Sequence, residues 1–122
     1  MKKNCLDTYA LWEILRENPK YAKILNQPFV ITEWTLAEFY KTLLREFEKT
    51  VAREWCNKLK PYAEVVSLSI VLEAINFQRE HDKEDLSLFD CVGYMFSIKK
   101  GYMFVTGDKE FKNKKEVLFI QK

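Results

Sequence analysis

The chain has 122 residues, close to the commonest size of one domain, and 48% of them are apolar, including 18 aromatic residues. This composition can fill a hydrophobic core and excludes a disordered chain, while three glycines and three prolines exclude collagen-like or linker-rich sequences. The net charge of +2 hides a basic end, because residues 99–122 hold seven lysines and three acids.

The predicted elements alternate strands with helices. Before Pro61 the pattern predicts a strand over 3–6, helices over 8–17 and 20–25, a strand over 29–32, and helices over 35–47 and 49–59. After it come a strand over 63–68, helices over 69–80 and 86–99, a strand over 102–106, a short helical segment after Asp108, and a strand over 117–121. Gly101 is placed to end the helix before it. Strands separated by helices imply βαβ units and a mainly parallel sheet, so the predicted fold class is α/β.

Other sequence features concern the environment of the chain. No stretch reaches the ~18 apolar residues of a membrane span, and Asp7 interrupts the N-terminus before a signal-peptide core can form. Three cysteines without C-x-x-C spacing argue against a disulfide framework or a zinc site, and one histidine leaves little for histidine-based catalysis. We therefore expect a soluble, cytoplasmic protein with no membrane contact.

Four carboxylates fall near the carboxyl ends of predicted strands. Asp7 ends the first strand, Glu38 lies in the first turn of the helix after the second, Asp90 begins the helix that leads into the fourth, and Asp108 follows that fourth strand. Strand ends and the helices after them share one edge of a parallel sheet, where ligands bind. Four converging acids would repel one another without a divalent cation, and Mg²⁺ or Mn²⁺ prefers oxygen ligands. Such a site can polarise a phosphodiester and lower the pKa of bound water.

The same acids also fit a structural role. Residues 35–38 and 87–90 both match the capping-box pattern [ST]-x-x-[DE], in which the acid closes a helix N-terminus. Asp7 and Asp108 could be N-caps worth ~1 kcal/mol each. Both interpretations remain open on spacing alone.

The surroundings of Asp90 favour the metal site. Its helix, residues 88–98, is apolar nearly all round, which indicates a buried helix. A carboxylate there costs several kcal/mol unless it is paired, hydrogen-bonded or bound to a metal. Gly93 and Ser97 share the side of Asp90, so their small size predicts space for a ligand to approach it.

Four segments resemble the motifs of a known family. Leu6-Asp7-Thr8-Tyr9-Ala10-Leu11 resembles the opening motif of PIN-domain proteins. Residues 35–39, 88–94 and 106–111 are similar to their second, third and fourth acidic motifs, in the same order across nearly the whole chain. The likeness is closest to the small prokaryotic VapC-like group. Many of those relatives have Asn where Tyr9 stands here, and small residues at the positions of Gly93 and Tyr94.

The resemblance implies a three-layer α/β/α sandwich with a mainly parallel central sheet, forming a single PIN-like domain over residues 1–122. It also implies a metal-dependent endoribonuclease using Mg²⁺ or Mn²⁺, typically the toxin of a toxin–antitoxin pair, with RNA as substrate, a cognate antitoxin as partner and a homodimeric state. By this resemblance Asp7 and Asp90 are the principal metal ligands, Glu38 and Asp108 complete the catalytic acidic cluster, and Thr8 and Thr106 support it.

The basic end of the chain supplies candidate RNA contacts. Lys99, Lys100, Lys109 and Lys112 are the lysines that we expect to contact phosphates. The alternative for this end is a solubilising lysine-rich edge. Phe111 is a core candidate that would anchor the loop carrying Asp108.

Other α/β classes with acidic sites fit less well. A receiver domain needs paired acids after its first strand, a dehalogenase-like phosphatase needs D-x-D, and no glycine-rich phosphate loop exists. The best alternative is a non-catalytic PIN-like interaction module that binds a protein partner or RNA. In it, the aromatic-rich helices 34–47 and 49–59 would form a groove for a partner helix. Core packing is the simpler interpretation of their Trp34 and Trp55.

Overall fold

The computed structural model describes residues 2–121, and a five-stranded sheet lies at its centre. The strands are β1 (Asn4–Leu6), β2 (Phe29–Thr32), β3 (Ala63–Glu64), β4 (Met103–Thr106) and β5 (Val117–Phe119). Their order is β3-β2-β1-β4-β5, and every neighbouring pair is parallel. Strands β2 and β3 thus lie on one side of β1, and β4 and β5 lie on the other side. The strand order therefore reverses between β1 and β4.

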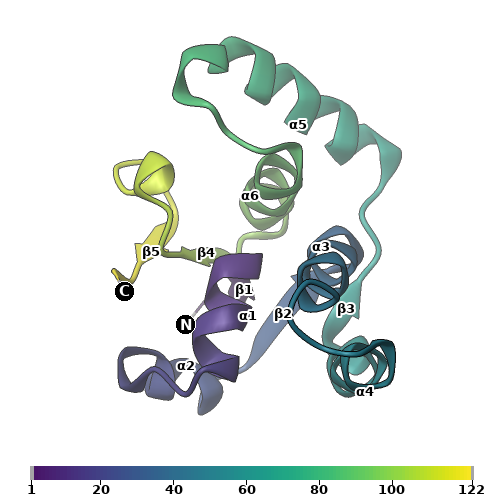
Figure 1. Ribbon diagram of the computed structural model, residues 1–122. Helices are drawn as coiled ribbons and strands as arrows, with labels where there is room; N and C mark the ends of the chain where they lie inside the picture. Colours follow the sequence, from purple (N-terminus) through teal and green to yellow (C-terminus); the bar gives the residue numbers. More distant parts are fainter. Residues whose placement is uncertain (1, 122) are drawn as a thin grey trace.

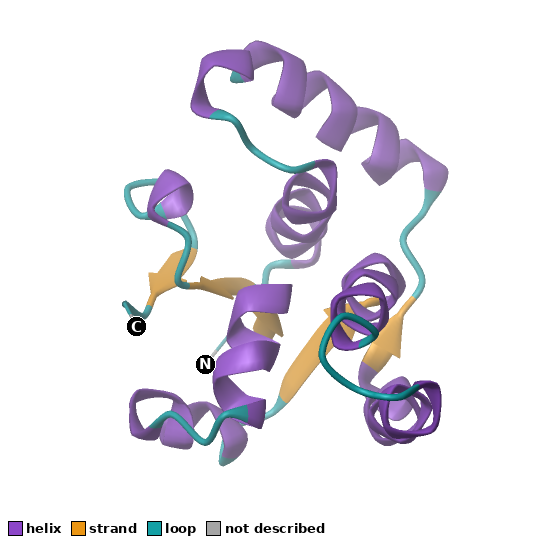
Figure 2. Ribbon diagram, viewed as in Figure 1, coloured by secondary structure: helices purple, strands orange, loops and turns teal. Residues whose placement is uncertain are grey.

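Six α-helices flank this sheet (Figures 1 and 2). They are α1 (Thr8–Leu15), α2 (Ala22–Leu25), α3 (Glu33–Leu43), α4 (Lys49–Leu59), α5 (Leu68–Glu80) and α6 (Leu88–Lys100). Helix α5 lies at the top of the view in Figure 1, with α6 beneath it and packed against it. No helix between residues 2 and 121 is long and apolar enough to cross a membrane.

Alternate side chains of the strands divide the interior into two cores. Leu6 and Ile31 pack with buried residues of α1, α2, α3 and α4. Their neighbours Cys5 and Val30 face the other way, toward Phe96 of α6. Because successive residues of a strand point to opposite faces, one sheet separates two helical layers. This arrangement confirms the predicted α/β/α sandwich.

Local capping explains where several helices begin and end. The side chains of Asp7, Thr32, Ser67 and Ser87 each accept a hydrogen bond from the backbone N–H three residues later, as N-caps do. Helix α6 ends at Gly101, whose φ of 74° is the left-handed conformation that glycine adopts without strain. The predicted end of this helix is therefore confirmed.

Several predicted boundaries differ from the structure, and at two of them the reason is an unrecognised cap. Helix α3 begins at Glu33 and not at residue 35, because Thr32 accepts the hydrogen bond from the Thr35 N–H at 2.9 Å. The expected capping box over 35–38 is therefore not formed. Strand β3 ends at Glu64 and not at residue 68, since Ser67 caps α5 directly afterwards.

Candidate functional site

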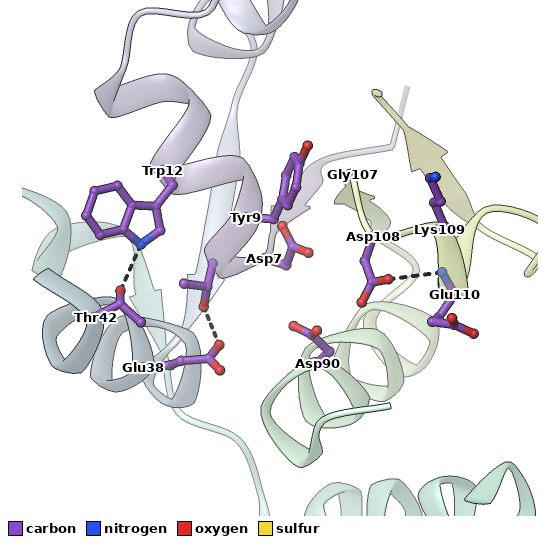
Figure 3. Close-up of a pocket in the computed structure, with 11 residues that line it drawn as sticks. Asp7, Tyr9, Trp12, Glu38, Thr42, Asp90, Gly107, Asp108, Lys109 and Glu110 are labelled. Atoms are coloured by element: carbon purple, nitrogen blue, oxygen red, sulfur yellow. Dashed lines mark hydrogen bonds between the residues drawn. The ribbon is translucent and has the colours of Figure 1, made fainter. Parts of the chain in front are cut away.

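The four predicted acids line one pocket of about 540 Å³. In Figure 3, the side chains of Asp7, Asp90 and Asp108 point toward a common space, and Glu38 lies on the opposite wall. Asp7 follows β1 and Asp108 follows β4, the two neighbours between which the strand order reverses. In open α/β sheets this reversal leaves a crevice outside the carboxyl ends of the strands. The topology therefore brings together acids that are distant in sequence.

Asp7 is the most deeply placed of the four, with 2% of its surface exposed. One carboxylate oxygen accepts the Ala10 N–H at 2.8 Å, which caps α1, and the other accepts the Thr106 hydroxyl. Burial, followed by the charge of Asp90, raises the pKa of Asp7 well above its usual value, although these two hydrogen bonds oppose the shift. Asp7 is thus an N-cap and a pocket residue at once.

Thr106 connects two of the acids. Its hydroxyl donates to Asp7 and accepts the backbone N–H of Asp108 at 3.0 Å. Asp108 in turn accepts the Glu110 N–H at 3.0 Å and caps the 3-10 helix Lys109–Phe111. This chain of hydrogen bonds holds the loop after β4 against the end of β1.

Glu38 reaches the pocket from the second turn of α3, because that helix begins at Glu33. The Thr8 hydroxyl donates to Glu38 Oε1 at 2.5 Å. One turn further along α3, Thr42 also lines the pocket and accepts the indole N–H of Trp12 at 2.8 Å. Two hydrogen bonds therefore tie α1 to α3 beside the acids.

Asp90 lies in the first turn of α6, where Ser87 Oγ accepts its backbone N–H at 3.1 Å. Of the two hydrogen bonds of the capping pattern over 87–90, the one accepted by the Ser87 side chain is thus formed. Burial, followed by the charges of Glu38 and Asp108, raises the pKa of Asp90 to about 7. Its ionised form is therefore disfavoured, as expected for a buried carboxyl group close to other acids.

Gly93 and Ser97 do not line the pocket that Asp90 lines, because the protein fills the space beside them. A Cβ on Gly93 would lie 3.0 Å from the Phe104 ring and 3.8 Å from Thr35 Oγ1. Ser97 is fully buried and donates to the Gly93 carbonyl at 2.8 Å. The prediction of an opening for a ligand is wrong here, because the small residues let α6 pack closely on β4.

The structure brings one of the four candidate lysines to the pocket wall, Lys109. Lys112 lies over the Phe119 ring, with its Nζ 5.6 Å from the ring centroid. Lys99 and Lys100 stand at the opposite end of α6, about 14 Å along the helix axis from Asp90. Lys99 there forms an ion pair with Glu73 at 3.1 Å.

Sequence reasoning missed several residues that line the pocket. These are Tyr9, Trp12, Thr42, Gly107 and Glu110. A usable signal existed for two of them, because Thr42 stands four residues after Glu38 and Trp12 four residues after Thr8, the spacing of one helix face. Tyr9, Gly107 and Glu110 carried no comparable signal.

The donor set suits a hard divalent cation. The described residues that line the pocket offer carboxylate and hydroxyl oxygens and include no cysteine or histidine. Within residues 2–121, no three acid, histidine or cysteine side chains approach closely enough to enclose an ion by themselves. Mg²⁺ does not require such a cage, since it keeps several waters and commonly binds through one or two carboxylates. Asp7 and Asp90, which both line the pocket, are candidate ligands for that mode of binding.

Comparison with known proteins supplies independent information on the family and the fold. The family model described as "PIN domain" matches residues 5–117. A chain of a toxin–antitoxin complex from Klebsiella pneumoniae is 15% identical, with a TM-score of 0.77 over 98% of this chain and 100% of that one. VapC20 of Mycobacterium tuberculosis, a sarcin-ricin loop cleaving toxin, is 17% identical, with a TM-score of 0.72 over 83% and 85%.

A third similar structure is VapBC2 from Rickettsia felis bound to a DNA fragment from their promoter. It is 16% identical, with a TM-score of 0.70 over 97% of each chain. At these identities the likeness concerns the fold. No relative among curated protein sequences matches the chain.

Proposed function

The chain belongs to the PIN domain family, and on that premise we propose that it is a divalent-metal-dependent endoribonuclease, the toxin of a toxin–antitoxin pair. The observation that carries the proposal is the gathering of four carboxylates, from four separate segments, in one pocket where the strand order reverses. The similar folds of a sarcin-ricin loop cleaving toxin and of toxin–antitoxin complexes support it.

In the proposed reaction, water adds to the phosphorus of an RNA phosphodiester and one ester oxygen leaves with a proton. Bound Mg²⁺ or Mn²⁺ supplies polarisation of the phosphate and acidification of water. Asp7 and Asp90 would hold the cation directly, and Glu38 and Asp108 would bind it through water or orient the attacking water. The Thr106 hydroxyl donates a hydrogen bond to the carboxylate of Asp7 and holds it in place, and the Thr8 hydroxyl does the same for Glu38.

Metal binding is expected to stabilise the folded protein, because a cation relieves repulsion among the carboxylates of the pocket. Addition of MnCl₂ or MgCl₂ to protein treated with a chelator should raise the melting temperature by several degrees, since a ligand at ~100 times its Kd adds roughly 3 kcal/mol. The same ions should start cleavage of single-stranded or structured RNA, and EDTA should stop it. Differential scanning fluorimetry and gel assays measure the two effects.

The two readouts separate binding from catalysis. RNA cleavage that continues in excess EDTA contradicts metal dependence. Stabilisation by Mn²⁺ without cleavage of any RNA supports the cation site and contradicts the nuclease. Calcium offers a further comparison, because it also prefers oxygen ligands but tolerates longer and less regular coordination.

We also propose that a cognate antitoxin binds between α3 and α4. A cavity of about 580 Å³ lies there, with apolar Leu36, Ala37 and Tyr40 on one side and charged Arg53 and Lys60 on the other. Such a mixture suits an amphipathic partner segment. The homodimer implied by the resemblance remains a prediction.

The two tryptophans of these helices do not line this groove. Trp34 contacts Phe89 edge-to-face with ring centroids 5.8 Å apart, and Trp55 packs against the core formed with α1 and α3. The interpretation of Trp34 and Trp55 as packing residues therefore fits the structure. The groove depends on Leu36 and Tyr40 instead.

Ala37→Arg is expected to separate toxicity from antitoxin control, because it places a long charged side chain on an exposed position of the α3–α4 groove. Expression of the variant should arrest bacterial growth as the wild type does. Co-expression of the product of the adjacent gene should relieve arrest by the wild type and fail with the variant, measured as colony counts. Ala22→Arg, at an exposed position of α2, is the matched control and should stay controlled. Equal relief of both variants would contradict this binding surface.

A further inference from the structure

Tyr9 and Gly107 form a contact at the edge of the acidic pocket. Tyr9 stands two residues after Asp7 on α1, is half-buried and lines the pocket, as does Gly107 at the end of β4 (Figure 3). A Cβ on Gly107 would lie 2.1 Å from Tyr9 Cε1, 2.5 Å from Cζ and 2.6 Å from Cδ1. This Cβ would lie close to Cε1 and almost equally far from its two ring neighbours, Cζ and Cδ1. Such a position lies above the face of the ring, because a point beyond the ring edge would be farther from Cζ and Cδ1. The backbone of Gly107 therefore packs flat against Tyr9.

This contact places the tyrosine ring beside the carboxylates. Any larger residue at position 107 would have to displace the ring, because real Cβ atoms do not approach ring carbons to 2.1 Å. The absence of a side chain on Gly107 thus leaves room for the aromatic ring of Tyr9. One face of the ring is supported by the backbone while the side chain also borders the pocket.

Trp12 is the second aromatic residue that lines the pocket, and it packs against two phenylalanine rings. The Trp12 ring lies edge-to-face with Phe39 and stacks on Phe47, with centroids 5.5 Å and 6.3 Å away. The guanidinium of Arg16 lies 4.8 Å from its ring centroid, and its indole N–H donates to Thr42. Tyr9 also lines the pocket, and its ring contacts Gly107.

We propose that Tyr9 is a substrate-binding residue, whose ring stacks on an unpaired base of the RNA next to the phosphate held at the acids. The inference rests on the proposed function and names a contact that positions the substrate at that site. Aromatic rings bind unpaired bases through their π-faces whatever the base. Stacking also suits this pocket, because it holds a neutral base and adds no negative charge to the acidic cluster. A ring already held by Gly107 loses little freedom on binding.

Binding of RNA without cleavage tests the proposal. The Asp90→Asn protein serves as the background, and the probe is a fluorescent single-stranded RNA of ~10 nucleotides, within the range of single-strand binding sites. Tyr9→Leu should weaken binding roughly 5- to 100-fold, the loss expected for one stacked base. Tyr9→Phe should bind within about twofold of the background, since it keeps the ring. Fluorescence anisotropy measures each Kd.

An RNA series with one abasic site per molecule tests the stacking independently of the folding of any variant. An abasic site at one particular position of the RNA should weaken binding as much as Tyr9→Leu does. When this RNA is combined with the Tyr9→Leu protein, the two losses of affinity should not add. Gly107→Ala should also weaken binding by displacing the ring. Tyr62→Leu is the matched control, because Tyr62 is an exposed tyrosine that stacks on Phe29 and does not line the acidic pocket.

The outcomes distinguish this inference from the proposed function. If the wild type cleaves RNA with a divalent metal but Tyr9→Leu binds and cleaves as the wild type does, the stacking inference is overturned and the nuclease stands. If no RNA is cleaved but one abasic position and Tyr9→Leu weaken binding without adding, the stacking stands and the nuclease fails. Additive losses at every abasic position overturn the inference.

Discussion

Replacement of Asp7 or Asp90 by Asn is expected to reduce RNA cleavage by more than ~100-fold. Substitution of residues that merely orient metal ligands already costs about 10- to 100-fold in affinity or activity, so loss of a ligand itself should cost more. Asn keeps the shape of the side chain but removes the charge that holds the cation. Initial rates on a labelled RNA, compared at equal protein concentration in Mn²⁺, measure the effect.

The stability of these variants shows whether the loss is chemical. Burial and neighbouring acids raise the pKa of Asp90, so its ionised form opposes folding without a cation. Asp90→Asn should therefore keep or raise the melting temperature in chelator, and should lose the stabilisation by Mn²⁺. Asp82→Asn, at an exposed acid outside the acidic pocket, should cleave normally. Cleavage that persists in both site variants would contradict the assignment and indicate a contaminating nuclease.

Phe111→Ala is expected to lower the free energy of unfolding by about 3–5 kcal/mol, the usual cost of removing a buried phenylalanine. Phe111 is fully buried, and its ring lies 5.3 Å from that of Phe104 and 5.5 Å from that of Tyr94. Its removal leaves a cavity beneath the segment that carries Asp108. Urea denaturation followed by circular dichroism measures the change.

The control for Phe111 is Phe47, which is 38% exposed and stacks on Trp12. Phe47→Ala should cost about 1 kcal/mol, since a partly exposed ring loses little burial and one aromatic contact. Equal losses for the two variants would show that Phe111 contributes no more than a surface ring. Where Phe111→Ala remains folded, its cleavage should fall as well, because the Asp108 loop loses its anchor.

Much of the fold could be predicted from the sequence because the deciding interactions are local. Asp7, Ser87 and Gly101 each begin or end a helix through groups within a few residues, so their spacing is visible in the chain. The same locality explains the error at α3, where Thr32 and Thr35 offered two caps one turn apart. The apolar pattern of α6 likewise predicted its burial.

The acidic residues could be selected from the sequence, because strand ends and the following helix starts share one edge of a parallel sheet. That rule placed Asp7 and Asp108 together, and both line the pocket. The rule could not place the lysines. Lys99 and Lys109 are near in sequence, but Lys99 lies in the last turn of α6, before β4, whereas Lys109 follows β4 and lines the pocket.

Only the tertiary structure decided the contacts between segments that are distant along the chain. Gly93 was expected to leave room for a ligand, but the ring of Phe104 from β4 fills that space. Gly107 accommodates the ring of Tyr9, which no spacing in either segment indicates. Residue identity determines the caps, the alternation of elements and the acids at strand ends, because those depend on neighbours within a turn. Which side chains then fill or border the pocket depends on the order of strands in the sheet, and that order is set by packing across the whole molecule.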